Sequence, residues 1–269
     1  MNHIIIFAAL SLINIQFTYA GLVMDQERYE SESSIRQNGK IYLQDNMFKV
    51  YDSGQDIATV LDLDKNQLTY INYSEKTYTL TTPEELLQFF KRISEQIDSQ
   101  IKEDLSKLPP DQKAKVEKEL KKKGFLKDST ESVKVSIKET GKKEKISGYT
   151  CTIFEIYKND KLNEEICLSN ELDYKNDVDI KKLSSFMNEF KKIGKSLGND
   201  IVVDSDQAFI DLFEKNGYPL KTTDHSVDET VFVEEIKTIT KKDISREEFF
   251  PPKGYEFKSL EKLLAPAFN

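Results

Sequence analysis

Residues 22–81 alternate short β-prone runs with turn residues at nearly even intervals, and this alternation constrains the fold more than any other feature of the chain. The runs are rich in β-branched and aromatic residues, which favour strands: KIYLQ, MFKVYD, DIATVLDL, QLTYINY and KTYTL. Turns are expected between them, at Asn38-Gly39, Asp45-Asn46, Ser53-Gly54, Asp64–Asn66 and near Ser74–Lys76. Strands at such even spacing predict one curved antiparallel sheet.

A helix is expected to follow at once. Thr82, Pro83 and Glu85 form the sequence signature of a capping box with proline at the first helical position. Apolar residues then recur at helical spacing as far as Pro109-Pro110, which should end the helix: Leu86, Phe89, Phe90, Ile93, Ile97, Ile101, Leu105 and Leu108. A more highly charged helical segment follows, as far as Gly124.

The second half of the chain returns to strands and adds two more helices. Strands are expected near 130–139, 149–157, 162–169, 218–223 and 229–240, and helices near 178–197 and 205–216. This order predicts an α+β fold in which helices pack across one face of a curved antiparallel sheet as a lid. We expect a single domain over residues 21–269, with helical insertions near 82–124 and 178–216, and an apolar pocket between the two layers.

Cys151 and Cys167 are the only cysteines of the chain. The two β-rich runs that contain them flank Asn159-Asp160, which predicts a hairpin. Folding the chain about this turn brings the cysteines nearly opposite each other, at a separation that a disulfide can bridge. The alternative is a pair of buried free thiols.

The first twenty residues predict export. Residues 4–14 form an apolar stretch too short to cross a bilayer as a helix, and Thr18-Tyr19-Ala20 has the small final residue of a cleavage site. Cleavage after Ala20 would make the protein periplasmic or secreted, in an oxidising compartment where disulfides persist. No cysteine follows Ala20 and no later stretch is long and apolar enough to span a membrane, so we expect no membrane anchor.

The charge and the scarcity of histidine exclude several classes of function. The formal net charge of −8 argues against nucleic acid, whose binding depends on phosphate neutralisation. Only His225 would remain after cleavage, which excludes a zinc site built on several histidines. His225 lies in the polar stretch KTTDHSVDE, which predicts an exposed turn rather than a catalytic base. We therefore expect no enzyme and no cofactor.

A calcium site is not expected either. Asp62, Asp64 and Asn66 match the start of an EF-hand loop, but Gln67 stands where glycine is required and Tyr73 where glutamate is required. The pattern is typical of a polar turn between two strands.

Four short segments are distinctive: YSEKTYTL at 73–80, GKKEKISGYTCTIFEIY at 141–157, NGYPLK at 216–221 and FFPPKGYEF at 249–257. Together they resemble an exported family of unknown function related to the LolA/LolB lipoprotein carriers. The resemblance implies an unclosed β-barrel with helices lying across it as a lid. This chain departs from the carriers because it is acidic and lacks tryptophan. The resemblance therefore implies the fold and not lipoprotein transport.

Two functions follow from this fold. The first is a non-enzymatic carrier for an apolar ligand, a lipid or acyl chain, in the bacterial envelope. The second is an envelope protein-interaction module without a small-molecule ligand. For the first function the candidate lining residues come from the predicted lid and from one face of the sheet: Phe89, Phe90, Ile93, Ile97, Leu61 and Leu63.

Overall fold

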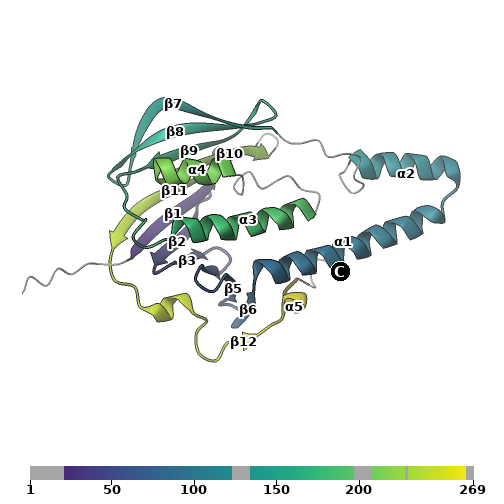
Figure 1. Ribbon diagram of the computed structural model, residues 1–269, viewed down its shortest axis with the longest axis horizontal. Helices are drawn as coiled ribbons and strands as arrows, with labels where there is room; N and C mark the ends of the chain where they lie inside the picture. The colour runs from purple at the N-terminus through teal and green to yellow at the C-terminus, as the bar shows by residue number, and fades with distance from the viewer. Residues whose placement is uncertain (1–20, 123–133, 197–206, 228–229, 265–269) are drawn as a thin grey trace, which may run out of the picture.

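One mixed sheet of 12 strands runs through the whole molecule (Figure 1). The computed structural model describes residues 21–122, 134–196, 207–227 and 230–264, so the predicted export signal lies outside the described residues. The strand order is β12-β6-β5-β4-β3-β2-β1-β11-β10-β9-β8-β7. All neighbours pair antiparallel except β12 and β6, which are parallel. The predicted α+β fold with a curved antiparallel sheet is confirmed.

The first six strands form the expected meander, and β1 pairs with β11 from the C-terminal half. The bounds of the strands are β1 Leu22–Glu30, β2 Gln37–Gln44, β3 Met47–Asp52, β4 Ile57–Asp62, β5 Gln67–Asn72, β6 Thr77–Thr81, β7 Val135–Ile146, β8 Tyr149–Lys158, β9 Lys161–Ser169, β10 Tyr218–Val227, β11 Thr230–Lys241 and β12 Glu256–Phe257. Strand β7 therefore includes the Lys/Glu-rich stretch after Gly141.

The predicted turn at Asn38-Gly39 is wrong. Both residues lie inside β2, where Gly39 pairs with Gln26 on one side and Asp52 on the other. The glycine instead permits close packing, because a Cβ there would lie 3.1 Å from the carbonyl oxygen of Tyr51. The other turns are confirmed by positive backbone φ angles, at Asp45, Asn46, Asp56, Asn66 and Lys76.

The helices begin and end close to the predicted positions. Their bounds are α1 Pro83–Ser106, α2 Pro110–Lys122, α3 Ile180–Ser196, α4 Gln207–Asn216 and the short α5 Leu260–Leu264. The capping box of α1 is confirmed, with Glu85 N donating to Thr82 Oγ1 at 3.2 Å and Thr82 N donating to Glu85 Oε2 at 2.9 Å.

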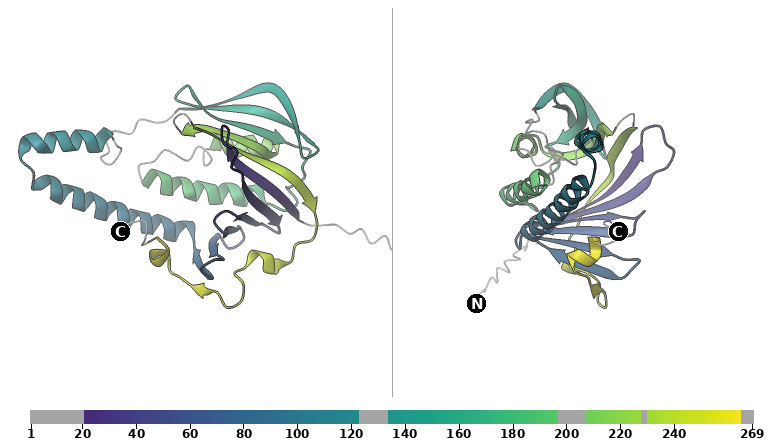
Figure 2. Two further views of the ribbon diagram at one scale, coloured as in Figure 1. Left: turned by 180° about the vertical axis from the view of Figure 1, so that it is seen from behind. Right: turned by 90° about the vertical axis from the view of Figure 1, so that its right-hand side faces the viewer.

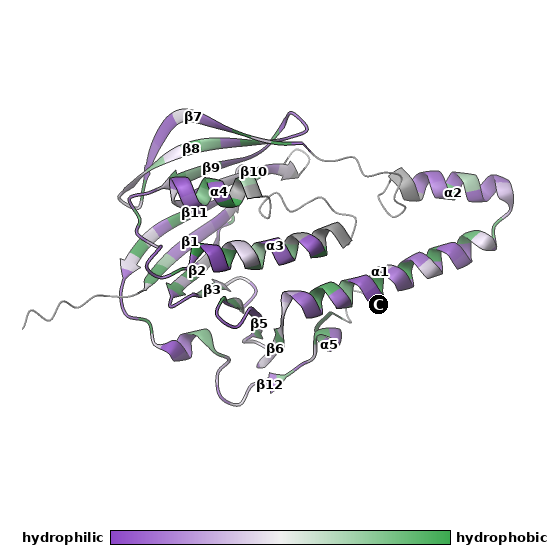
Figure 3. Ribbon diagram, in the orientation of Figure 1, coloured by the Kyte–Doolittle hydropathy of each residue, from purple (hydrophilic) through white to green (hydrophobic). Residues whose placement is uncertain are grey.

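Helices α1, α3 and α4 lie on the concave side of the sheet (Figure 2). Helix α1 packs against α3, and its outer half continues with α2 beyond the edge of the sheet (Figure 1). Helix α2 is mostly hydrophilic along its length (Figure 3). The main core lies between the sheet and α3, where Met24, Ile41 and Leu43 pack with Phe186.

The C-terminal segment covers the opposite, convex face of β1–β6. After β11 the chain forms a 3-10 helix, Arg246–Phe249, and Phe249 is almost completely buried. It packs with Ile244 against a second core that includes Val60 and Ile71. Apolar residues on both faces of these strands are therefore buried, which explains why strict alternation of polar and apolar residues is weak in β4.

Candidate functional site

An apolar cavity of about 370 Å³ lies between the concave face of the sheet and helices α3 and α4. Its size falls within the range of small-molecule sites in proteins. The sheet contributes Leu43, Phe48, Leu61 and Ile166, the turn after β4 contributes Leu63, and the helices contribute Ile180, Leu183, Ser184, Met187, Ile210 and Phe213. Tyr174, Val178, Tyr218 and Pro219 complete the apolar wall.

The turn between β2 and β3 fixes the start of α3. Asn46 Oδ1 accepts a hydrogen bond of 2.7 Å from Asp179 N, and Asn46 N donates to Asp177 O at 2.8 Å. The Asp179 carboxylate in turn accepts the backbone N–H groups of Lys181 and Lys182, at 2.9 and 3.2 Å. Such a cap satisfies orphan donors of the first helical turn, so the turn both starts the helix and holds it over the cavity.

The turn between β4 and β5 holds α3 at two further points. Lys182 Nζ contacts Asp64 Oδ1 at 2.6 Å, and Asn66 Nδ2 donates to Glu189 Oε2 at 3.0 Å. The hydrogen bond from Lys182 holds the pKa of the Asp64 carboxyl below its ordinary value. The polar residues that partly matched an EF-hand loop therefore attach a helix to the sheet. Over the described residues, no group of three or more His, Cys, Asp or Glu side chains could hold a metal ion.

Two tyrosines in edge-to-face contact form part of the cavity wall. The rings of Tyr174 and Tyr218 lie 5.4 Å apart at 64°, an edge-to-face arrangement that aromatic pairs prefer. The Tyr174 hydroxyl donates to the carbonyl oxygen of Phe213 at 3.2 Å, which ties this wall to the end of α4. Burial, with the nearby Glu214 carboxylate, raises the pKa of Tyr174 to about 12, and burial raises the pKa of Tyr218 as well. Both are neutral at physiological pH.

The cavity has a polar strip at one end, where strands β9, β10, β11 and β1 lie side by side. Strand register places Ile166, Thr222, Glu234 and Arg28 in one row across these strands. Glu234 Oε2 accepts a hydrogen bond of 2.9 Å from Gln26 Nε2, and its Oε1 lies 3.4 Å from Arg28 Nε. Glu164, Thr222 and Glu234 are the polar residues of β9–β11 that line the cavity.

A second, more polar cavity of about 280 Å³ continues from this strip. It shares Phe48, Tyr218, Pro219, Thr222 and Glu234 with the apolar cavity. Its further lining includes Gln26, Arg28, Gln37, Asn38, Asp52 and Lys221. The two cavities therefore adjoin at these shared residues, and we call the first the chamber and the second, more polar one the mouth.

The structure places the predicted lining residues in two different environments. Leu61 and Leu63 line the apolar chamber, whereas Phe89, Phe90, Ile93 and Ile97 of α1 are absent from its described lining. Phe89 is buried and stacks edge-on against Phe90 at 5.5 Å, while Ile97 is 42% exposed. Helices α3, which packs against α1, and α4 provide the helical wall instead.

His225 does not lie in an exposed turn, as its polar neighbours predicted, but in strand β10. Its Nε2 lies 3.0 Å from Glu165 Oε2. Glu164 and Ile166, the residues on either side of Glu165, line the chamber, so Glu165 and its histidine partner belong to the other face of the sheet. His225 is therefore separated from the cavity.

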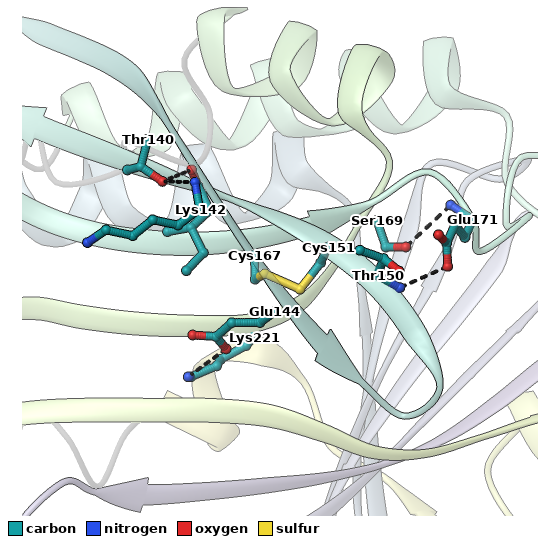
Figure 4. The surroundings of a disulfide bond; sticks show 10 residues. Thr140, Lys142, Glu144, Thr150, Cys151, Cys167, Ser169, Glu171 and Lys221 are labelled. Atoms are coloured by element: carbon teal, nitrogen blue, oxygen red, sulfur yellow. Dashed lines mark hydrogen bonds and ion pairs between the residues drawn. A yellow bond between two sulfur atoms is a disulfide. The ribbon is translucent and has the colours of Figure 1, made fainter.

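The expected disulfide between Cys151 and Cys167 is present, with Cα atoms 5.3 Å apart (Figure 4). The cysteines are not directly opposite each other, because Cys167 pairs with Ile153 and a register shift falls between Ile156 and Tyr157. Beside the bridge, Lys221 Nζ contacts Glu144 Oε2 at 3.1 Å (Figure 4). The bridge links β8 to β9 next to Ile166 of the chamber.

Comparison with known proteins identifies one family and, among other matches, two distantly similar structures that we report here. A family model described as "Domain of unknown function (DUF4412)" matches residues 91–255. No curated protein matches the chain. The structure of PNGF-II in a C2 crystal form is similar over 93% of this chain and 33% of its own, at 11% identity and a TM-score of 0.44. The Pseudomonas aeruginosa MucA/MucB complex is similar over 86% of this chain and 56% of that chain, at 7% identity and a TM-score of 0.39. The chain thus spans about a third of the PNGF-II chain and about half of the matched chain of the MucA/MucB complex.

Proposed function

The chain belongs to the family described as a domain of unknown function, DUF4412, and we propose that it is a non-enzymatic binding or carrier protein for an apolar ligand, a lipid or acyl chain, in the bacterial envelope. The observation that carries this proposal is the chamber of about 370 Å³ between the sheet and α3. A core that served stability alone would be expected to pack without such a space. A curved sheet with helices over its concave face also fits the resemblance to the LolA/LolB carriers.

The chemistry of the chamber supports binding rather than catalysis. Its charged lining residues are Glu164 and Glu234. The Glu234 carboxylate is engaged by Gln26 and Arg28, and His225 belongs to the opposite face of the sheet. A general base must lie within hydrogen-bond reach of the proton that it abstracts, and among the described residues both carboxylates of the lining belong to strands β9 and β11 rather than to the apolar helical wall.

Filling the chamber is expected to abolish ligand binding without unfolding the protein. Ser184 of α3 lines the chamber, whereas the next residue, Ser185, is exposed. We expect Ser184→Trp to weaken binding of N-phenyl-1-naphthylamine, a neutral fluorescent probe, by about tenfold or more, because the indole ring would occupy the space. Ser185→Trp is the matched control and should bind as the unmodified protein does.

Fluorescence titration and thermal unfolding of both variants make this test decisive. Equal probe affinity in Ser184→Trp and Ser185→Trp, with both proteins folded, would show that the chamber is not the binding site. Native mass spectrometry of the protein purified from its own host adds an independent measurement, since a carrier is expected to retain part of its ligand.

We also propose that the protein is exported and cleaved after Ala20. The disulfide is compatible with an oxidising compartment. None of the described helices is long and apolar enough to cross a membrane. Gly21 is buried, and a side chain at this position would collide with the Lys242 carbonyl oxygen. Cleavage after Ala20 would leave this glycine as the first residue.

Cleavage is expected to stabilise the fold through Asp177. Burial raises the pKa of the Asp177 carboxyl, Asp45 and Asp173 act in the same direction, and a hydrogen bond from the Gly21 backbone N–H opposes them. A carboxyl whose pKa is raised in the folded state costs stability as the pH rises from the unfolded to the folded pKa, and the full cost is present above the folded pKa. Cleavage would replace the amide of Gly21 by an ammonium group beside the carboxylate, which would lower the pKa and remove this cost.

Asp177→Asn should therefore have opposite effects in two forms of the protein. In the chain that begins at Gly21, it should lower the free energy of unfolding at pH 7 by about 2 kcal/mol, because it removes a charged hydrogen-bond partner. In a chain extended by Ser-Ala before Gly21, it should leave stability unchanged or raise it. Urea unfolding of the four proteins at pH 7 and pH 3 is the measurement. Equal losses of unfolding free energy in both forms would refute the ion pair between the Gly21 ammonium group and the Asp177 carboxylate.

A further inference from the structure

The adjoining cavities determine the shape of the ligand that they can hold. The chamber is largely apolar, whereas the mouth adds amide and charged side chains, such as Gln26, Gln37 and Arg28, to its apolar ones. Burying an unpaired polar group in the chamber would be costly, whereas the mouth offers such a group hydrogen-bond partners. The space therefore fits a single-chain amphiphile, with its chain between the sheet and α3 and its polar end at Thr222 and Glu234.

The charge at the boundary between chamber and mouth decides which polar end fits. Glu234 lines both cavities, and Glu164 of strand β9 lines the chamber. An ionised carboxylate accepts hydrogen bonds and donates none. A ligand carboxylate or phosphate placed at this boundary would meet like charge, whereas a hydroxyl or ammonium group would find an acceptor.

The cations of the mouth do not offset this preference. Arg28 lies against Glu234, with Nε 3.4 Å from Oε1, and Lys221 Nζ lies 3.1 Å from Glu144 Oε2. The remaining charged residue of the mouth lining is Asp52. An anionic head group would have to break one of these ion pairs, and like-charge juxtaposition at an interface is penalised strongly.

We infer that the ligand is a single-chain amphiphile whose polar end donates hydrogen bonds and carries no negative charge, and that Glu234 is the residue that selects it. This inference rests on the proposed carrier function and adds the chemical class of the ligand. Free fatty acids and acyl phosphates are excluded by the same residue that accepts a hydroxyl or ammonium group. Thr222, which pairs with Glu234 across β10 and β11, offers a further hydroxyl at the same boundary.

Three ligands with the same ten-carbon chain test the inference: decanoate, decylamine and monodecanoylglycerol. Each is titrated against the protein loaded with N-phenyl-1-naphthylamine, at pH 7.4 and below its critical micelle concentration. We expect decylamine and monodecanoylglycerol to displace the probe at concentrations about tenfold lower than decanoate does. Decanoate displacing the probe as well as the other two, or better, would overturn the inference.

Glu234→Gln separates a specific role of this residue from a general effect of the acidic chain. The variant should bind decanoate about tenfold more tightly and lose its preference for decylamine. Glu235→Gln removes the same charge from the next residue of β11, which lies on the other face of the sheet and lines neither cavity. It should leave the order of the three ligands unchanged, and an equal change in both variants would contradict the assignment to Glu234.

The outcomes also distinguish this inference from the proposed function. If neither the probe nor any of the three ligands binds, the carrier function fails. If the ligands bind in an order that Glu234→Gln does not alter, the carrier function stands and the selection by Glu234 is refuted.

Discussion

Gly217→Ala is expected to destabilise the protein by about 4 kcal/mol or to prevent folding. Gly217 joins α4 to β10 with φ +98°, and a Cβ on its backbone would lie 2.1 Å from the carbonyl oxygen of Ser169. The next nearest atoms are also backbone, Ser169 C at 2.4 Å and Asn170 N at 2.7 Å. Backbone atoms cannot rotate away as a side chain can, so α4 and β9 would have to separate.

Gly148→Ala provides the matched control for this prediction. Gly148 has a similar φ of +90° in the turn between β7 and β8, but a Cβ there would meet nothing within 4 Å. Its replacement should cost only the backbone strain, about 1–2 kcal/mol. Urea unfolding monitored by far-UV circular dichroism measures both variants. Similar losses in the two would mean that the strained φ, and not the contact with Ser169, accounts for the effect.

Gly217 also shows which features of the fold the local sequence can predict. The sequence correctly placed the end of α4 near Gly217, because glycine favours the left-handed conformation that ends helices. It could not indicate the contact with Ser169, which lies far away along the chain. The capping box of α1 and the turn at Asp45-Asn46 were predictable for the same local reason.

The prediction of a turn at Asn38-Gly39 is wrong because an Asn-Gly dipeptide occurs both in tight turns and at places where strands pack closely. In a short hairpin it adopts positive φ angles, but here the strands are longer and Gly39 is placed between Gln26 and Asp52. Close approach to Tyr51 requires a missing side chain as strictly as a tight turn does. Only the pairing of the strands decides between the two.

The wall of the chamber could be predicted for the sheet and not for the helices. Leu61 and Leu63 follow from strand alternation, which places both on one face. Helices α1 and α3 both have apolar stripes, and the stripes do not say which helix covers the sheet. That choice depends on Asp64 with Lys182 and on Asn66 with Glu189, polar contacts between segments more than a hundred residues apart.

Glu234 and Thr222 were not predicted for a related reason. Strand β11 reads VFVEEIK, in which two adjacent glutamates point to opposite faces, and only the register with β10 and β1 shows which one enters the cavity. Because the register shifts between Asp25 and Gln26, counting alternate residues along β1 does not show which glutamate of β11 faces the cavity. Two adjacent glutamates directly after the apolar run Val231–Val233 were the available signal.

Reduction of the Cys151–Cys167 bridge is expected to lower the free energy of unfolding by about 3 kcal/mol, as the loop-entropy account gives for a loop of similar length. The bridge joins residues 16 positions apart, and both cysteines are buried. Oxidised and reduced forms of the same chain are the best comparison, because Cys→Ser substitutions would leave hydroxyl groups in a buried site. Guanidinium unfolding of the two forms measures the difference.

The probe affinity of the reduced protein tells whether the bridge acts on the folded or the unfolded state. In the loop-entropy account the bridge restricts the unfolded chain, so β8 and β9 keep their pairing in the folded protein after reduction. Ile166 would then stay in the chamber wall, and affinity for N-phenyl-1-naphthylamine should change by less than about twofold. If affinity falls together with stability, the bridge instead maintains the position of β9, because only a change in the folded state can alter the chamber.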